Sequence, residues 1–310
     1  MSQITDESTV TEGSDLRRLH QQASARFDAL VHAVRAEQWQ LPTPCAGWTV
    51  RDLVNHVVAE NLWTAPLMDG ATIADVGDAY DGDVLGDDPV AAWDAAAASA
   101  RQAVDAPGAV ERTVHLSFGD TPATEYVNQL FADHLIHGWD LAQAIGADAR
   151  LEPELVAACG SWFDTVEETY RQAGAIGPRP LVTVGADAQA QLLARFGRSD
   201  TLAVVHAFND AFARRDVDAV MSLMTDDCVF ESTAPAPDGQ RYTGRDAVRS
   251  VWEDLFAASP TRFDIEDTFG AGDRAVVHWT YHFRDGHVRG VDVLRVRDGR
   301  IAEKLSYVKG

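Results

Sequence analysis

Three side chains able to bind a metal ion are the most informative feature of the sequence. Asp133 and His137 stand four residues apart in DHLIHGWDLAQAIG, so on a helix both project from one face and can hold the same ion. His56 lies among apolar residues in RDLVNHVVAE, which places its imidazole near a protein interior. Two histidines and one carboxylate suit a divalent ion such as Zn²⁺, with an open position for water or substrate.

Other interpretations of these residues stay open on spacing alone. Asp133 and His137 also fit a solvated pair one helical turn apart, and His56 fits a hydrogen-bonded core histidine. His134 is a rival ligand, but on a helix it points about 100° away from Asp133. Glu60, four residues after His56, is a second rival and could instead act as an acceptor that orients a histidine.

Charge and composition limit the class of partner. The chain has 26 basic and 48 acidic residues and a formal net charge of −22, so nucleic acid and anionic membranes would be repelled and a small molecule is the expected partner. No segment approaches the roughly 18 uninterrupted apolar residues of a membrane span. The three cysteines, Cys45, Cys159 and Cys228, support neither a disulfide framework nor a paired-cysteine zinc site. We expect a cytoplasmic protein in which Cys45 is a small buried thiol.

Apolar positions that recur every three or four residues predict a mostly helical first part of the chain. This periodicity begins at Asp15, and Thr49 followed by Asp52 forms a capping pattern that opens the helix carrying His56. The polar, acidic residues 1–14 are interpreted as a disordered leader without the features of a secretory signal. Further helices are expected over residues 90–104, 123–145, 154–173 and 187–196.

The pattern changes at Gly197-Arg198-Ser199-Asp200. A helix expected over residues 202–213 leads into strand-like runs joined by Asp-Gly turns, including one at Asp285-Gly286. This order predicts an α+β cone, with helices on one face of a curved antiparallel sheet. We therefore expect a helical domain over residues 15–198 and the cone over residues 199–310.

Several separated motifs of the first domain resemble a known family. LPTPCAGWTVRDLVNHVV, DHLIHGWDLAQAIG and DAQAQLLARFGR are similar, in this order, to the N-terminal domain of mycothiol-dependent maleylpyruvate isomerase, one of the DinB-like four-helix bundles. The resemblance covers about residues 15–198. It implies that His56, Asp133 and His137 are the metal ligands, with Asp133 at a position where the isomerase has Glu.

The resemblance also implies a chemistry. A divalent metal, with zinc as the expected ion, would bind a low-molecular-weight thiol such as mycothiol and hold it as thiolate. A free thiol has a pKa of about 8.5, and a coordinating cation stabilises its charged form at neutral pH. The thiolate could add to an unsaturated substrate or displace a leaving group, and a hydrolase with metal-bound water would use the same ligands.

The second domain resembles the SnoaL-like and ketosteroid isomerase-like group of the nuclear transport factor 2 superfamily. The motifs are FNDAFARRDVDAVMSLMTDDCVFES, YTGRDAVRSVWEDLF and GVDVLRVRDGRIAEKLSYV. The resemblance gives Asp292 the position of an acid that hydrogen-bonds the substrate, but it places Ser232 where the isomerase has its base and Phe208 where it has a tyrosine. We expect Phe208, Ser232, Trp252 and His278 to contact the substrate.

Asp292 has two interpretations. Alternation along its strand turns it toward an apolar interior, where burial would raise its pKa and make it a proton donor. The alternative is a buried acid whose hydrogen bonds a neighbouring side chain satisfies.

The leading hypothesis is a metal-dependent thiol transferase or isomerase, in which the cone binds substrate or pairs two subunits. One alternative places an isomerase, cyclase or hydrolase reaction in the cone, with Asp292 as the catalytic residue. Another is a non-catalytic, metal-stabilised ligand-binding protein.

Overall fold

The computed structural model describes residues 4–45, 47–182, 186–257, 262–283, 286–297 and 299–309. By their contacts the residues form two compact units, 1–169 and 170–310. This division falls inside α6 (Pro153–Gln172), earlier than the boundary expected at residue 199. The segment after α6 contacts later parts of the chain, because Gly272 donates its backbone N–H to the carbonyl of Leu181 at 2.9 Å.

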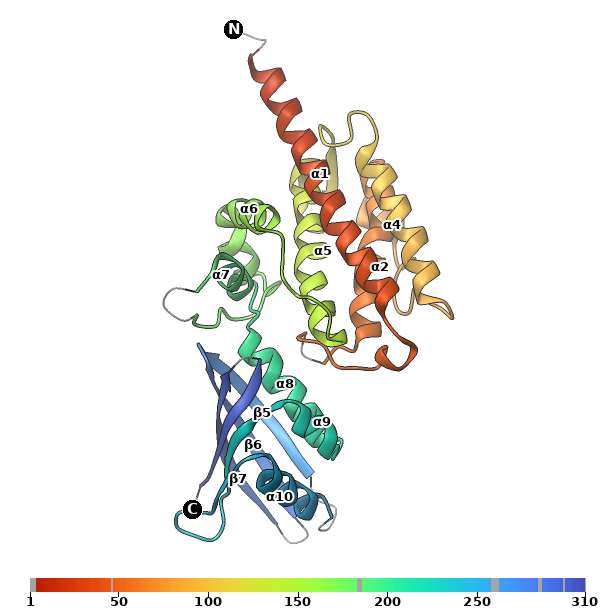
Figure 1. The fold of residues 1–310 in the computed structure, drawn as a ribbon. Coiled ribbons are helices and arrows are strands. Elements are labelled where there is room, and N and C mark those ends of the chain that lie inside the picture. The colour runs from red at the N-terminus through yellow and green to blue at the C-terminus, as the bar shows by residue number, and fades with distance from the viewer. Residues whose placement is uncertain are drawn as a thin grey trace. The chain divides into compact units, whose positions relative to one another are not determined.

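The first unit contains a four-helix bundle, as expected. The four helices are α1 (Ile4–Ala33), α2 (Val50–Met68), α4 (Pro89–Asp105) and α5 (Ala123–Ile145). In this bundle α1 lies beside α5 and α4, and α2 lies beside the same two helices (Figure 1). Phe27, Trp93 and Leu141 fill its interior and are completely buried.

The first helix is longer than the sequence indicated. Helix α1 begins at Ile4 and covers residues 4–14, where a disordered leader was expected.

Short elements connect the long helices. They are η1 (Ala36–Gln38), α3 (Ile73–Val76), the hairpin strands β1 (Thr113–Leu116) and β2 (Gly119–Pro122), and, after α6, helix α7 (Ala188–Arg195). The predicted cap of α2 is present, because Thr49 Oγ1 accepts the backbone N–H of Asp52, whose carboxylate accepts the N–H of Thr49. This reciprocal capping fixes where the helix that carries His56 begins.

The second unit contains the α+β cone. Its helices are α8 (Asp200–Ala213), α9 (Val217–Ser222) and α10 (Arg245–Ala257). Its strands are β3 (Met224–Glu231), β4 (Arg241–Thr243), β5 (Arg262–Ala271), β6 (Arg274–Phe283), β7 (Gly286–Arg297) and β8 (Arg300–Val308). They form one sheet in the order β4-β3-β8-β7-β6-β5, antiparallel except for the parallel pair β3 and β8.

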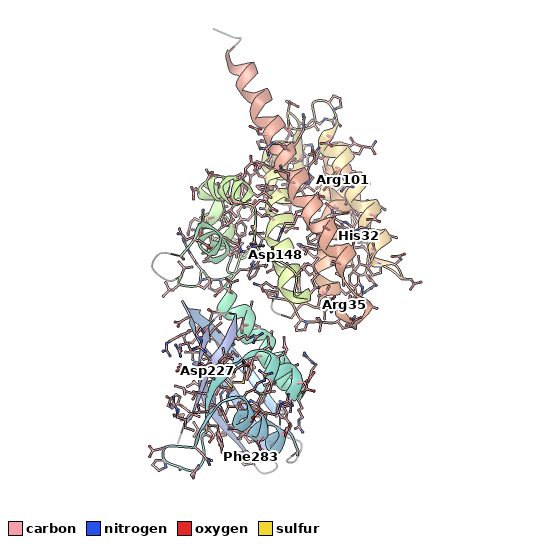
Figure 2. All side chains as sticks on the ribbon, viewed as in Figure 1. His32, Arg35, Arg101, Asp148, Asp227 and Phe283 are labelled. Atoms are coloured by element: carbon pink, nitrogen blue, oxygen red, sulfur yellow. The ribbon has the colours of Figure 1, made fainter. Side chains whose placement is uncertain are left out.

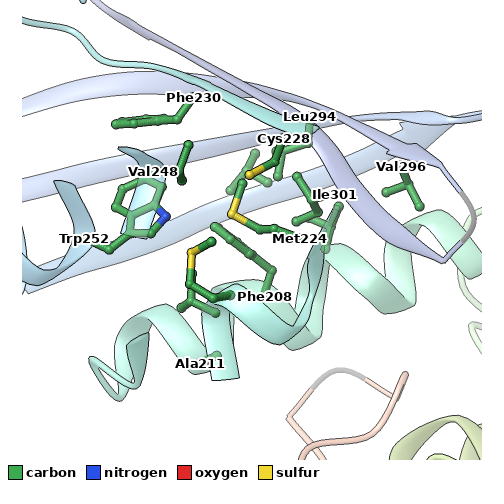
Figure 3. Packing of buried hydrophobic residues seen from close by; sticks show 14 of the residues in the cluster. Phe208, Ala211, Met224, Cys228, Phe230, Val248, Trp252, Leu294, Val296 and Ile301 are labelled. Carbon is green, nitrogen blue, oxygen red and sulfur yellow. The ribbon is translucent and has the colours of Figure 1, made fainter. Parts of the chain in front are cut away.

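Apolar side chains join the helices of the cone to the sheet. Phe208 of α8 and Trp252 of α10 are almost wholly buried and pack against Phe230 and Leu294 of the sheet (Figure 3). Both units are filled with side chains between their elements (Figure 2). Among the described residues, no helix combines the length and the apolar composition needed to span a membrane.

Candidate functional site

Helices α2 and α5 bring His56, Asp133 and His137 together. Asp133 Oδ1 lies 3.5 Å from His56 Nε2 and 3.4 Å from His137 Nε2. One ligand atom from each of the three residues lies within 4.8 Å of the other two. The two helices run side by side, so the residue on α2 meets the pair that stands one turn apart on α5.

The spacing and the unsatisfied polar atoms of this group fit a cation. Two donors that each lie about 2.0–2.2 Å from a tetrahedral ion are separated by about 3.4 Å. The Oδ2 atom of Asp133 is enclosed and has no hydrogen-bond partner within the part of the chain that the structure describes. A buried carboxylate oxygen without a donor is unfavourable, and a bound cation would satisfy it.

Burial and neighbouring charges shift the pKa of the Asp133 carboxyl in opposite directions. Burial raises its pKa, but the imidazoles of His137 and His56 lower it more strongly, and the net pKa lies below the ordinary value of an aspartic acid. Asp133 is therefore ionised at neutral pH, as a metal ligand must be.

Asp140 is a functional candidate that the sequence analysis missed. Its side chain is completely buried, and its Oδ2 atom accepts a hydrogen bond from His137 Nδ1 at 3.0 Å. This contact fixes the tautomer of His137, so that the Nε2 lone pair faces Asp133. The sequence feature that could have identified Asp140 is its position three residues after His137 on the same helix.

Cys45 and Trp48, from the loop before α2, both lie against His137. Cys45 is half-buried, and its thiol donates to Asp140 Oδ2 at 3.2 Å. The thiol is therefore part of a polar network, not the apolar filler that the sequence analysis expected. Trp48 stacks on His137 with ring centroids 5.9 Å apart and lies 5.1 Å from the ring of His56.

The two rival ligands lie outside this group. His134 donates through Nδ1 to the carbonyl of Leu130 at 2.8 Å, and its ring packs against His20, Phe27 and Trp93 in the bundle interior. Glu60 contributes no atom to the three convergent ligands. Burial and the charge of Asp133 raise the pKa of Glu60, so a second carboxyl stands near the centre.

Two further groupings of ligand-type atoms are present among the described residues: Cys45 and Asp140 form one that shares His137 with the centre, and the other lies on the surface of the bundle. Asp28, His32 and Asp94 place one atom each within 4.8 Å of the others, and His32 is labelled in Figure 2. His32 and Asp94 are exposed, and Asp28 accepts the indole N–H of Trp93 at 2.9 Å. Asp94 Oδ1 lies 3.4 Å from His32 Nε2, so both carboxylates have partners within the protein.

The cone encloses a cavity of about 490 Å³, which we call the cone cavity. Of the residues predicted to contact or act on a substrate, Phe208, Ser232, Trp252 and Asp292 line this cavity, and their contact with a substrate stays a prediction. The expectation for His278 was wrong. On β6 its neighbours along the cavity wall are residues 279, 281 and 283, so strand alternation turns His278 to the opposite face, where its ring lies 5.8 Å from that of Phe269.

Asp292 is paired in the structure. Its Oδ2 atom lies 2.7 Å from Lys304 Nζ, and its Oδ1 atom accepts from Ser306 Oγ at 2.6 Å. Lys304 also donates to Ser306 Oγ at 2.9 Å, so the three side chains form one buried network. Of the two interpretations of Asp292, the structure matches the buried acid whose hydrogen bonds neighbouring side chains satisfy, because strand β8 places Ser306 opposite Asp292 and Lys304 beside it.

Ser232, at the expected base position, is engaged within its own loop. Its hydroxyl donates to the carbonyl of Ala234 at 2.7 Å and accepts the backbone N–H of Gln240 at 3.2 Å. A serine held in this way is a poor substitute for a carboxylate base.

Comparisons with known proteins agree with this architecture. Residues 20–142 match the mycothiol maleylpyruvate isomerase N-terminal domain, and residues 205–304 match the SnoaL-like domain. An uncharacterized protein of Mycobacterium tuberculosis is 38% identical over 140 residues, which cover 44% of this chain and 70% of that protein.

Two solved structures resemble part of the chain. An NTF2-like protein of unknown function from Mesorhizobium loti is 47% identical with a TM-score of 0.34, and the match covers 36% of this chain and 92% of that one. A steroid delta-isomerase from Pseudomonas aeruginosa is 21% identical with a TM-score of 0.32, covering 36% of this chain and 82% of that one.

Fold and site together define a protein that joins a helical bundle, with a cluster of His and Asp side chains that could hold a metal ion, to a SnoaL-like α+β domain. The chain belongs to the family of the mycothiol maleylpyruvate isomerase N-terminal domain.

Proposed function

We propose that this chain is an enzyme that activates a low-molecular-weight thiol, such as mycothiol, at a divalent metal held by His56, Asp133 and His137. Zinc is the ion we expect from the two imidazoles and one carboxylate. The observation that carries the proposal is the convergence of one ligand atom from each of the three residues, together with the enclosed Oδ2 atom of Asp133, which has no hydrogen-bond partner among the described residues. The family of the first domain supports it.

The residues around the centre have separate roles in this proposal. A bound cation would lower the pKa of a coordinated thiol and make it a nucleophile at neutral pH. Asp140 holds the ring of His137 in one orientation, and Trp48 covers both histidines on one side. The cone would bind the electrophilic substrate or pair two subunits.

Metal analysis of purified protein tests the centre directly. We expect about one divalent ion per wild-type chain and less than a tenth of that in His56→Ala and in His137→Ala, because two remaining ligands hold zinc weakly. His32→Ala, a histidine in the surface grouping, is the matched control and should keep the ion. Unchanged metal content in both site variants would overturn the proposal.

Cobalt substitution tests the thiol. Adding mycothiol to the Co²⁺-loaded protein should produce a thiolate-to-metal charge-transfer band in the near ultraviolet, without any need for turnover. A panel of electrophiles then separates thiol transfer from hydrolysis, because only transfer yields a thioether product. A metal-loaded protein without this band would contradict thiol binding and would leave the hydrolase and the non-catalytic interpretations in place.

A further inference from the structure

Cys45, His137 and Asp140 bring a sulfur, a nitrogen and an oxygen atom together on the far side of the His137 ring from Asp133. Cys45 Sγ lies 3.2 Å from Asp140 Oδ2 and 3.8 Å from His137 Nδ1, and this oxygen and this nitrogen are 3.0 Å apart. Around a tetrahedral zinc ion, a sulfur ligand lies about 3.5 Å from a nitrogen or oxygen ligand, and the latter two lie about 3.4 Å apart. The three atoms are therefore already spaced much like the ligands of one cation.

A cation can replace the hydrogen atoms of these contacts. The thiol of Cys45 and the Nδ1–H of His137 both donate to Asp140 Oδ2. When a metal ion binds in their place, the thiol proton goes to solvent and the ring proton moves from Nδ1 to Nε2. Asp133 Oδ1, 3.4 Å from Nε2, is placed to accept this N–H. The ring of His137 thus needs no rotation to hold an ion on its Nδ1 side.

The elements that carry the three side chains fix them before any ion binds. His137 and Asp140 stand one turn apart on α5, and Asp140 is completely buried. The backbone N–H of Cys45 donates to Thr43 Oγ1 at 3.2 Å, and its carbonyl accepts the N–H of Trp48 at 3.0 Å. Buried carboxylates are as a rule paired or bound to a metal ion, and ligands fixed in advance lose little conformational freedom on binding.

The ligand atoms of this group differ in kind from those of the proposed metal centre. The centre offers two imidazoles and a carboxylate, whereas the second group has sulfur in place of one imidazole. A thiolate selects soft, polarisable cations over hard ones. Cd²⁺, Hg²⁺ and Cu⁺ should therefore favour the sulfur-containing group, while the imidazoles of the centre suit Zn²⁺.

We propose that Cys45, His137 Nδ1 and Asp140 form a second metal position, the sulfur position, which captures a thiophilic cation and competes with the centre. The two positions use opposite nitrogens of one imidazole. A neutral imidazole has one nitrogen lone pair to offer, so an ion on Nδ1 leaves Nε2 protonated and removes a ligand from the centre. The sulfur position does not depend on the proposed function, and only its effect on the centre rests on it. A soft metal ion would then inhibit the enzyme at a defined site.

Cadmium titration of the metal-depleted, full-length protein tests the sulfur position. CdCl₂ should produce a thiolate-to-cadmium charge-transfer band in the ultraviolet, because one ligand is sulfur. Cys45→Ser keeps a hydrogen-bond donor for Asp140 but removes the sulfur, so the band should be lost. Cys159→Ala, which removes a completely buried thiol on α6, is the control and should keep the band. A wild-type cadmium complex without the band, or a band that survives in Cys45→Ser, would overturn the proposal.

His56→Ala separates the sulfur position from the centre. This variant lacks one ligand of the centre but keeps all three of the sulfur position, so Cd²⁺ should still give the full band. His137→Ala removes the shared imidazole and should weaken the cadmium complex by roughly 10-fold or more, since loss of even an orienting partner costs that much. Circular dichroism checks that both variants fold. Loss of the band in folded His56→Ala would show that the sulfur belongs to the centre itself and would contradict a second position.

Zinc release tests the competition. Cd²⁺ is added to the Zn²⁺-loaded protein, and the zinc that passes an ultrafiltration membrane is measured as the band grows. We expect about one Zn²⁺ released for each Cd²⁺ bound, because His137 cannot hold both ions. Cys45→Ser should need roughly 10-fold more Cd²⁺ for the same release. Zinc that stays bound while the band reaches full size would overturn the competition. A protein that never loads zinc but gives the full cadmium band would refute the proposed function and support the sulfur position.

Discussion

The interior histidines of the bundle differ in the hydrogen-bond partners of their two ring nitrogens. His137 has the carboxylate of Asp140 at Nδ1, which leaves Nε2 to face the centre. His134 has a backbone carbonyl at Nδ1 and no partner at Nε2 in the described part of the chain. His20 has no partner for either ring nitrogen there, and its ring lies 5.3 Å from that of His134. Two histidines three residues apart on one helix, His134 and His137, therefore have different hydrogen-bond partners.

Asp140→Asn should weaken metal binding without abolishing it. The asparagine keeps the shape of the side chain but removes the charge that holds His137 Nδ1–H, and loss of such an orienting contact lowers metal affinity by about 10–100-fold. Competition with a chromophoric chelator measures the apparent Kd. Asp148→Asn, an exposed change in the loop after α5, serves as the control. Equal affinities in the two variants would mean that Asp140 has only a packing role.

His20 should make the bundle sensitive to acid. Burial, with smaller contributions from His134 and Arg101, lowers the pKa of His20 from 6.5 to about 3 in the folded chain. Between these values the unfolded chain binds a proton that the folded chain does not, so stability falls as pH falls through this window. The loss amounts to about 2 kcal/mol between pH 6.5 and pH 5.

Substitution of His20 by leucine tests this pH dependence. Urea unfolding of His20→Leu at pH 7 and pH 5 should show a smaller loss of stability than the wild type, because leucine has a similar volume and takes up no proton. His32 is exposed, and its pKa is raised, chiefly because its Nδ1–H donates a hydrogen bond to the backbone carbonyl of Asp28, so His32→Gln should not reduce the acid sensitivity. An unchanged pH dependence in His20→Leu would show that other groups dominate.

At the scale of elements, local sequence patterns were enough to predict the helices. The contacts that could not be predicted depend on packing and pairing between segments that are far apart in the chain. The spacing of Asp133 and His137 is contained in one helical turn, and Thr49 caps α2 within four residues, so both could be predicted. The convergence of His56 with that pair depends on how α2 packs beside α5, and only the family resemblance indicated it. The Lys304 pairing depends on the register of β7 and β8, which shifts between Arg295 and Val296.

The cap of α2 should contribute measurably to the stability of the bundle. Thr49→Ala removes the hydroxyl that accepts the Asp52 N–H, and loss of such a cap destabilises by about 1 kcal/mol. Thr72→Ala is the matched control, since Thr72 and Asp75 form the same reciprocal cap on α3, a helix of four residues. Urea unfolding should show a clear decrease in stability for the first variant and a smaller one for the second. Equal losses would show that the cap matters no more for α2 than for a single helical turn.

At the scale of the whole molecule, two compact units each carry their own candidate site. The proposed metal ligands belong to the unit of residues 1–169, and the cone cavity lies within the unit of residues 170–310. The apolar interiors are also separate, since Phe27 and Trp93 pack in one cluster and Phe208 and Trp252 in another. A ligand that binds only one unit should therefore stabilise that unit selectively.

Thermal unfolding should reveal this division. A ligand that binds only the folded state stabilises it by about 2.7 kcal/mol at a concentration 100 times its Kd. Adding Zn²⁺ to metal-depleted protein should raise the midpoint of one calorimetric transition by several degrees and leave the other where it is. His137→Ala should abolish this shift. A single transition that Zn²⁺ moves as a whole would show that the two units unfold as one cooperative body, and the metal site would then have to be measured by binding alone.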